Sequence, residues 1–205
     1  MICSILIPSR KRVERLKACI ASFFSTASGS DWDIRIRLDD DDRESLKALP
    51  ELQEHCFNRI AVSVGERLGW DRIEEYYLEL SGSTTARWIW FFNDDAVVEG
   101  SAWDNKLAAV PAKGFIVQPE IHRLGGSSYP RDPRAPFVIV PNRVWEEFGL
   151  TQIPHPNDVA LPALLREHGW QTAFLPGIGI HHQRDNDEQL KQHRADFEPG
   201  VTGMY

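Results

Sequence analysis

The chain has 205 residues, of which 42% are hydrophobic and 10% aromatic, so it can bury a substantial core in one domain but is short for two. Its 23 lysine and arginine residues against 30 aspartate and glutamate residues give a net charge of −7, which offers no large cationic field for a nucleic-acid backbone. No apolar run reaches the roughly 20 residues that span a bilayer, and residues 2–8 are too few for a signal-peptide core. The three cysteines match no metal-ligand spacing, and their odd number is poor evidence for disulfides. We therefore expect a cytoplasmic protein.

Strand-like and helix-like patterns alternate along the first half of the chain. Short β-rich runs cover residues 2–8, 32–38 and 59–64. Segments with apolar side chains at helical spacing cover residues 13–24, 43–56 and 68–80. Pro50 is expected to break the second of these helices into two pieces. Strands that alternate with helices predict an α/β domain with a mostly parallel sheet.

The most hydrophobic stretch, residues 87–92, ends abruptly at Asn93, Asp94 and Asp95. A continuous aromatic and β-branched run is typical of a strand buried on both faces, and ligands of an open α/β sheet bind at the carboxyl edge of such strands. Two adjacent carboxylates repel each other unless a cation lies between them, and a divalent metal with oxygen ligands meets that need. The alternative is a strand end whose acids are solvated or cap the next turn.

Two further polar segments follow predicted strands. Residues 8–12 (Pro-Ser-Arg-Lys-Arg) place three cations where the first helix begins, a position suited to a phosphate or nucleotide, and Arg10 is the best candidate. The second strand ends in four successive aspartates, residues 39–42. Most of these must face water, but one can be aimed at a donor-rich ligand. In a parallel sheet, all three strand ends would share one edge.

A strand ending in Pro8, a second ending in Asp39 and a hydrophobic strand ending in Asn93-Asp94-Asp95 resemble the nucleotide-binding half of GT-A glycosyltransferases, particularly the large family-2-like group. The resemblance covers roughly residues 2–182. It implies a Rossmann-like, three-layer α/β/α domain with a mostly parallel central sheet. Residues 1–98 would form the nucleotide-binding half and residues 99–182 the acceptor half, while the tail at 183–205 could close over bound donor as a lid.

The same resemblance implies a metal site. In this group a DxD motif holds a divalent cation, Mn²⁺ or Mg²⁺, that bridges the two phosphates of a nucleotide-sugar. Here Asn93 replaces the first aspartate and supplies an uncharged amide oxygen, which weakens the motif without abolishing it. Asp95 would be the third-position ligand, and a late histidine, either His181 or His182 at the end of an apolar strand, would complete the metal shell.

Carried over position by position, the resemblance also assigns the donor pocket. Pro8 and Ser9 would line the nucleoside pocket, with Asp39 facing the base. Arg72 would lie near the phosphates or the base, and Asp94, between the two metal ligands, would face the nucleotide.

The second half is expected to build the acceptor side. A short helix at 99–110, strands at 115–119 and 135–141, a turn-rich loop at 125–133 that could contact substrate, and a short helix around 144–148 precede a longer helix within 155–170. In the resembling enzymes an acidic residue at the start of that last helix deprotonates the acceptor hydroxyl, which here would be Asp158. Asp is also a favoured N-cap, so Asp158 could merely cap the helix.

The sequence thus predicts a metal-dependent glycosyltransferase that uses a nucleoside diphosphate sugar, preferably a UDP-sugar, and inverts by direct displacement with Asp158 as base. A retaining enzyme could use the same metal site. One alternative is a nucleotide-sugar-binding module without turnover, which Asn93 keeps open. The other is a nucleotidyltransferase of similar fold, although residues 8–12 lack the glycine typical of that class. The acceptor stays open among glycans, lipid-linked glycans, small molecules, proteins and modified nucleic-acid bases.

Overall fold

The structure is a computed structural model that describes residues 1–54, 58–69, 72–124, 127–132, 137–142, 144 and 160–182. Its strands are β1 (Cys3–Ser9), β2 (Trp32–Asp39), β3 (Ile60–Gly65), β4 (Trp88–Phe91), β5 (Ala96–Glu99), β6 (Phe115–Leu124), β7 (Ser127–Pro130), β8 (Ile139–Pro141) and β9 (Gln171–His182). Its helices are α1 (Val13–Thr26), α2 (Arg43–Glu54), α3 (Ile73–Gly82), α4 (Trp103–Ala108) and α6 (Ala160–Glu167).

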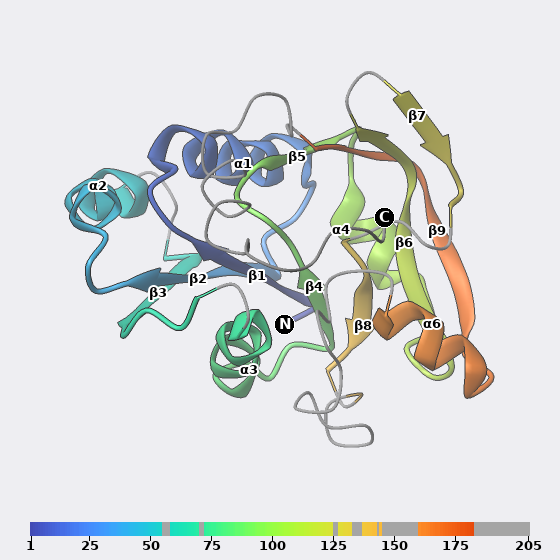
Figure 1. Cartoon of the computed structure of the whole chain (residues 1–205). Coiled ribbons are helices and arrows are strands. Elements are labelled where there is room, and N and C mark those ends of the chain that lie inside the picture. Colours follow the sequence, from blue (N-terminus) through green and yellow to red (C-terminus); the bar gives the residue numbers. More distant parts are fainter. Residues whose placement is uncertain are drawn as a thin grey trace.

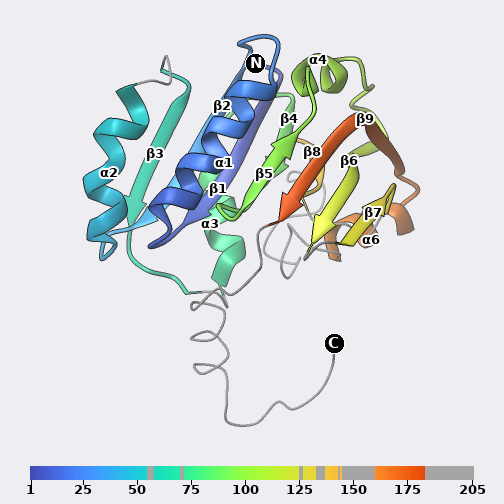
Figure 2. The ribbon, with the colours of Figure 1, turned by 90° about the horizontal axis from the view of Figure 1, so that it is seen from above.

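All strands join one sheet in the order β3-β2-β1-β4-β8-β6-β9-β5, and β7 pairs with β6 beside this path. The four strands of the first half are parallel to one another, with β1 between β2 and β4. Strand β8 adds antiparallel to β4, and β9 lies parallel to β6 and antiparallel to β5. Figure 2 shows the strands of the second half turned away from the first four, so that the sheet curls. The parallel half sets the carboxyl ends of β1, β2 and β4 along one edge.

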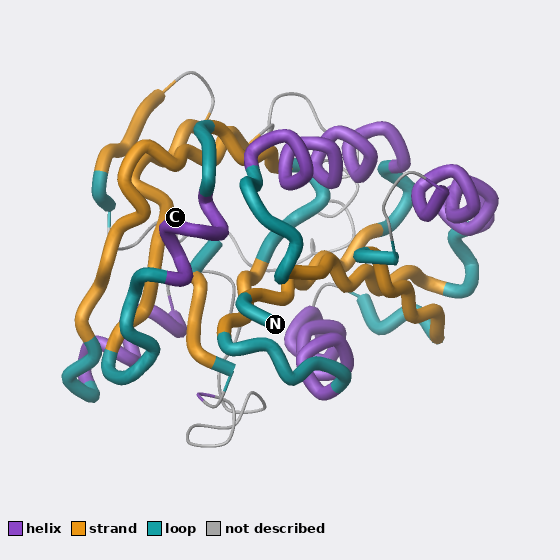
Figure 3. Tube along the Cα trace, turned by 180° about the vertical axis from the view of Figure 1, so that it is seen from behind, coloured by secondary structure: helices purple, strands orange, loops and turns teal. Residues whose placement is uncertain are grey.

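Helices cover both faces of this sheet, which gives three layers. Figure 1 shows α1 and α2 on one side of the first-half strands and α3 on the other, and Figure 3 shows the same layering from behind. Because successive strand residues face opposite sides, Trp88 and Trp90 of β4 pack in the core with α1, whereas Ile89 and Phe91 pack in the core with α3 and α6. The continuous hydrophobic run of β4 is explained by burial on both faces.

The core on the α1 side is dominated by aromatic rings. Phe23 of α1 makes edge-to-face contacts with Trp90, Phe92 and Trp103 at centroid distances of 5.3, 4.8 and 5.7 Å. Such pairs add about 0.5–1.5 kcal/mol each beyond their burial. Helix α1 is therefore held firmly against the strand that ends in the acidic segment.

Several predicted elements differ from the observed ones. Helix α2 runs through Pro50, contrary to the prediction that this proline breaks it. Pro50 lies on the exposed side of the helix, so the backbone carbonyl that loses its N–H partner can bond to water instead. Helix α3 begins at Ile73 rather than at 68. The predicted loop at 125–133 contains β7, an exposed strand paired with β6, and residues 96–99 form β5 ahead of the short helix.

Some predictions fall outside the described residues: most of the helix around 144–148, the base Asp158 and the lid at 183–205. Within the described part of the chain, no helix is long and apolar enough to cross a membrane.

Candidate functional site

The acidic segment after β4 meets the cationic loop after β1. Ser9 donates a hydrogen bond from Oγ to Asp94 Oδ2 at 2.7 Å. Arg12 Nη1 lies 2.9 Å from Asp94 Oδ1 and 3.3 Å from Asp95 Oδ2. A single guanidinium therefore bridges the two carboxylates that the sequence places in tandem. Arg10 was the predicted cation of this loop, but Arg12 is the one beside Asp94 and Asp95, since residue order alone does not show which side chain turns toward β4.

Asp94 is almost completely buried, with 4% of its surface exposed. Burial disfavours the charged carboxylate and raises the pKa of Asp94 to about 6, and the neighbouring charge of Asp95 adds to the rise. Arg12 and Ser9 act in the opposite direction, because both stabilise the ionised form. Asp94 therefore takes up a proton at a higher pH than an ordinary aspartate, although it is still mostly ionised at neutral pH.

Strand β9 brings an imidazole to the second acid. His182 lies opposite Ala96 in the β5–β9 pairing, and its Nε2 is 3.1 Å from Asp95 Oδ1. His181 lies opposite Val97 and is exposed, while His182 is buried. Of the two candidate histidines, His182 is the one beside Asp95, and His181 points to the other face of the strand.

Asn93 is placed differently from the two aspartates. The hydroxyl of Tyr77, from α3, lies 3.2 Å from Asn93 Oδ1 and 3.1 Å from the Phe92 carbonyl oxygen, and can donate to either. The amide oxygen that was expected to bind metal thus faces α3. Tyr77 is not among the candidates that the sequence singles out, because nothing in the pattern distinguishes its hydroxyl from that of an ordinary core tyrosine.

Asp95 and His182 are the side chains that could bind a divalent metal here. Among the described residues, no three His, Cys, Asp or Glu side chains gather closely enough to hold an ion by themselves. Asp95 and His182 nevertheless supply one carboxylate and one imidazole side by side, a pair that suits Mn²⁺ when oxygens of a bound ligand fill the remaining positions. The residues therefore fit a metal that is shared with a ligand.

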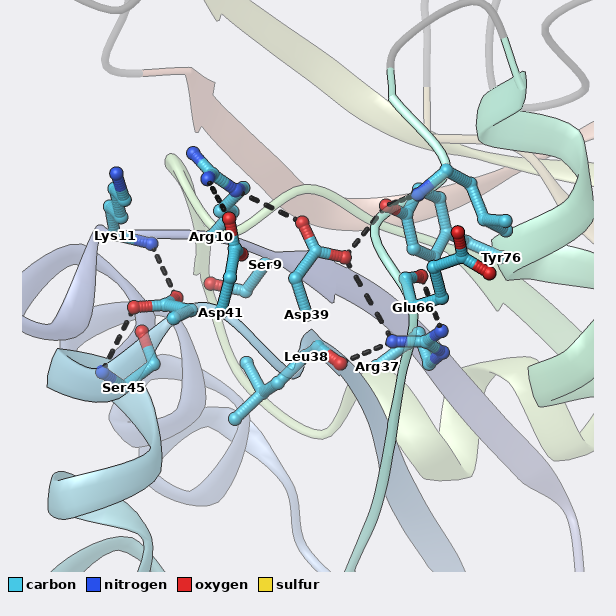
Figure 4. Close-up of polar contacts among 12 residues, drawn as sticks. Ser9, Arg10, Lys11, Arg37, Leu38, Asp39, Asp41, Ser45, Glu66 and Tyr76 are labelled. Carbon is cyan, nitrogen blue, oxygen red and sulfur yellow. Dashed lines mark hydrogen bonds and ion pairs between the residues drawn. The ribbon is translucent and has the colours of Figure 1, made fainter.

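A second cluster surrounds Asp39 at the end of β2 (Figure 4). Tyr76 donates from its hydroxyl to Asp39 Oδ1 at 2.7 Å, and Arg10 Nε lies 3.0 Å from Asp39 Oδ2. The backbone N–H of Leu68 donates to the Tyr76 oxygen at 2.8 Å, so the tyrosine proton is left to point at Asp39. Burial raises the pKa of Asp39, while Tyr76 and Arg10 oppose that rise. Asp39 is thus held in place by a hydroxyl donor on one oxygen and by a cation on the other.

Arg37, two residues before Asp39, is only 3% exposed and fixes the surrounding loop. Its Nη2 donates to the Glu66 carbonyl oxygen at 3.1 Å and its Nη1 to the Gly65 carbonyl oxygen at 3.3 Å, while Nε pairs with Glu79 at 2.6 Å. The guanidinium also lies over the ring of Tyr76, 5.2 Å from its centroid. The sequence does not single out Arg37, because a charged residue in a predicted strand is expected on the exposed face.

The remaining candidate residues are Pro8, Arg10 and Arg72. Pro8 is half-buried at the end of β1, opposite Arg37 in the parallel pairing. Arg10 also pairs with Asp41 at 2.7 Å, and this contact is visible in Figure 4. Arg72 is exposed at the start of α3 and pairs with Glu75 of the same helix at 2.5 Å.

No family model and no curated protein matches the sequence. Solved structures do match. Residues 1–349 of S. aureus TarS in complex with UDP-GlcNAc superpose with a TM-score of 0.67 at 11% identity, over 93% of this chain and 61% of that one. The mannosyltransferase PcManGT from Pyrobaculum calidifontis, in complex with GDP-Man and Mn²⁺, gives a TM-score of 0.67 at 12% identity, over 94% of this chain and 60% of that one. The chain has a GT-A-like fold.

This GT-A-like domain confirms the predicted α/β class and the resemblance to the glycosyltransferase fold. It spans about 60% of the length of those two solved chains and 39% of a longer solved chain of TarS. Along the carboxyl edge of its parallel strands it sets one acid surrounded by donors, Asp39, and a pair of buried acids, Asp94 and Asp95, with a cation and an imidazole beside them. In open α/β sheets, ligands bind along the carboxyl edge of the strands.

Proposed function

We propose that this chain is a metal-dependent glycosyltransferase that moves a sugar from a nucleoside diphosphate sugar, with a UDP-sugar as donor, to an acceptor hydroxyl. The observation that supports it most is the tandem Asp94–Asp95 pair beside His182 at the carboxyl edge of a GT-A-like fold. Two proteins of this fold were solved with UDP-GlcNAc and with GDP-Man and Mn²⁺, respectively, which supports nucleotide-sugars as the ligand class.

Asp95 and His182 would hold Mn²⁺ or Mg²⁺, which when bound neutralises the charge of the departing diphosphate. Asn93, whose amide oxygen faces Tyr77, is a weaker candidate ligand. Ser9 and Arg12 keep Asp94 oriented from the other side. Arg10, at the start of the cationic loop, lies between Asp39 and the solvent and is placed to meet a phosphate oxygen.

The hydrogen bonding of Asp39 favours some nucleobases over others. Its described neighbours Tyr76 and Arg10 are donors, so the carboxylate is kept as an acceptor. An acceptor suits a base with an imino N–H, such as uracil or guanine, and opposes cytosine, which presents a lone pair at the same position. Pro8 and Ser9 would border the same nucleoside from β1, with Arg72 further along the edge.

Asp158 remains the proposed base for the acceptor hydroxyl, with inversion by direct displacement. It lies outside the described residues. Replacing Asp158 by Asn should abolish sugar transfer while leaving UDP binding intact. Transfer at the wild-type rate would contradict this role.

The first test is calorimetric titration with UDP, GDP and CDP, with Mn²⁺ present and again with EDTA. We expect UDP to bind in the micromolar range with Mn²⁺, to lose that binding in EDTA, and to bind more tightly than CDP. If none of the three nucleotides binds, with Mn²⁺ or with EDTA, the proposal is overturned.

A nucleotide-sugar-binding module without turnover is the second candidate, and the position of Asn93 favours it because its amide oxygen lies toward Tyr77 of α3. An assay of donor turnover distinguishes the glycosyltransferase from the binding module. UDP binding with neither donor hydrolysis nor transfer to any of the acceptor classes would favour the module.

A further inference from the structure

Arg12 occupies the space between the two carboxylates of the candidate metal site. The side chains of Asp94 and Asp95 are 6% and 10% exposed, and that of Arg12 is 18% exposed. Two carboxylates so far from bulk water need a nearby positive charge, because their mutual repulsion is weakly screened. The guanidinium of Arg12 supplies that charge in the protein itself.

The position of Arg12 is fixed by helix α1 rather than by a loose loop. Its carbonyl oxygen accepts the first hydrogen bond of the helix, from Leu16 N–H at 2.8 Å. The preceding residue is also tied down, since Lys11 N–H donates to Asp42 Oδ2 at 2.6 Å. Helix α1 packs into the aromatic core through Leu16 and Phe23. A rigid element therefore delivers this cation to the acids.

Arg12 and a metal would share the same carboxylate. Asp95 faces His182 with Oδ1 and Arg12 with Oδ2. A divalent cation held by Asp95 and His182 would lie within a few ångströms of the guanidinium, and two positive groups at that separation repel each other. The described groups that contact the acids include Ser9, Arg12 and His182, and of these three Arg12 carries the permanent positive charge.

We propose that Arg12 is a built-in competitor of the metal, which makes metal binding depend on the bound diphosphate. The inference rests on the proposed function, because the diphosphate is the proposed ligand. Two carboxylates and one guanidinium leave a single net negative charge, which attracts a divalent cation weakly. When a diphosphate arrives, its charges compensate the metal and the guanidinium together, and Arg12 can turn to a phosphate oxygen. By linkage, the metal then strengthens diphosphate binding by the same factor.

The test measures Mn²⁺ affinity by electron paramagnetic resonance of the free ion, without nucleotide and with saturating UDP. In the wild type, UDP should tighten Mn²⁺ binding by about tenfold or more. Arg12→Gln should tighten Mn²⁺ binding in the absence of UDP by about tenfold, because it removes a nearby like charge, and should reduce the enhancement by UDP. Arg12→Lys keeps the charge and should resemble the wild type.

Lys17→Gln is the matched control, because it removes one positive charge from the same helix where Lys17 pairs with Glu14 and Glu51. It should leave Mn²⁺ affinity unchanged. Unchanged or weaker Mn²⁺ affinity in a folded Arg12→Gln variant would overturn the inference, and so would a wild type that binds Mn²⁺ equally well with and without UDP. If UDP itself fails to bind, the proposed function is overturned, while the nucleotide-free measurement still reports directly on competition by Arg12.

Discussion

At the scale of single residues, the candidate site depends on which face of a strand each side chain occupies. His181 and His182 are neighbours in sequence, but the β5–β9 register turns only His182 toward Asp95. Replacing His182 by Ala should weaken Mn²⁺ binding in the presence of UDP by about tenfold or more, because a ligand is lost. His181→Ala, on the exposed face, is the matched control and should bind Mn²⁺ like the wild type. No loss in His182→Ala, or an equal loss in both variants, would contradict the assignment of His182 as the ligand.

The hydroxyl of Tyr76 offers a test of whether Asp39 binds the nucleotide, because its removal changes the hydrogen bonding of Asp39 without changing Asp39 itself. Tyr76→Phe deletes the hydroxyl that donates to Asp39 Oδ1, and we expect UDP affinity to fall by about tenfold. The hydroxyl lowers the pKa of Asp39 against the upward effect of burial, so its removal should raise that pKa further. If UDP binds to ionised Asp39, its affinity will be lost as pH falls, and the midpoint of that loss should move to higher pH in Tyr76→Phe.

The control for this titration is Tyr129→Phe, which removes a hydroxyl from an exposed tyrosine in β7. Protonation of the UDP phosphates is common to all three proteins, so only a difference between them reports on Asp39. A weaker affinity with an unchanged midpoint would mean that Tyr76 stabilises the fold and does not tune the carboxyl.

At the scale of elements, the sequence predicted those whose pattern is local. β1, β2 and β4 were recognisable from short β-rich runs, which are continuous and apolar where a strand is buried on both faces. The polar residues that follow two of these strands include Asp39, Asp94 and Asp95. β7 was missed because all four of its residues are exposed, so no hydrophobic pattern marks it as a strand. The side-chain contacts between different elements could not be predicted from the sequence either. The bridge from Arg12 to Asp94 joins residues 82 apart in sequence, and only the sheet order β1-β4 brings them together.

Gly65, at the end of β3, shows how one element supports another. A Cβ placed there would lie 2.6 Å from Nη2 of Arg37, the buried guanidinium that holds the loop after β3. Gly65→Ala should therefore destabilise the protein by about 1–3 kcal/mol, because Arg37 must shift from a site where its donors are satisfied. Chemical denaturation gives this free energy of unfolding. Gly82→Ala is the control, since a Cβ at Gly82 meets nothing within 4 Å, and its effect should be small.

At the scale of the whole molecule, the layers separate packing from chemistry. Two hydrophobic clusters, one on the α1 side of the sheet and one on the α3 side, hold the strands. The polar groups of the candidate site lie at one edge, where β1, β2 and β4 end. A ligand bound along that edge would contact three strand ends and the start of α1 at once. Its binding should therefore stabilise the entire cooperative unit rather than a single loop.

This leads to a prediction for the thermal stability of the protein. A ligand that binds only the folded state at 100 times its dissociation constant adds about 2.7 kcal/mol, which in a chain of this size raises Tm by about 5–10 °C. We expect UDP with Mn²⁺ to produce such a shift in differential scanning calorimetry, and EDTA to remove most of it, because the metal joins the diphosphate to Asp95 and His182. UMP with Mn²⁺ is the matched control and should give a smaller shift, since it lacks the second phosphate that the metal would bridge. Equal shifts from UDP and UMP, or a UDP shift that survives EDTA, would place the nucleotide away from the Asp94–Asp95 edge and contradict a metal-bridged diphosphate.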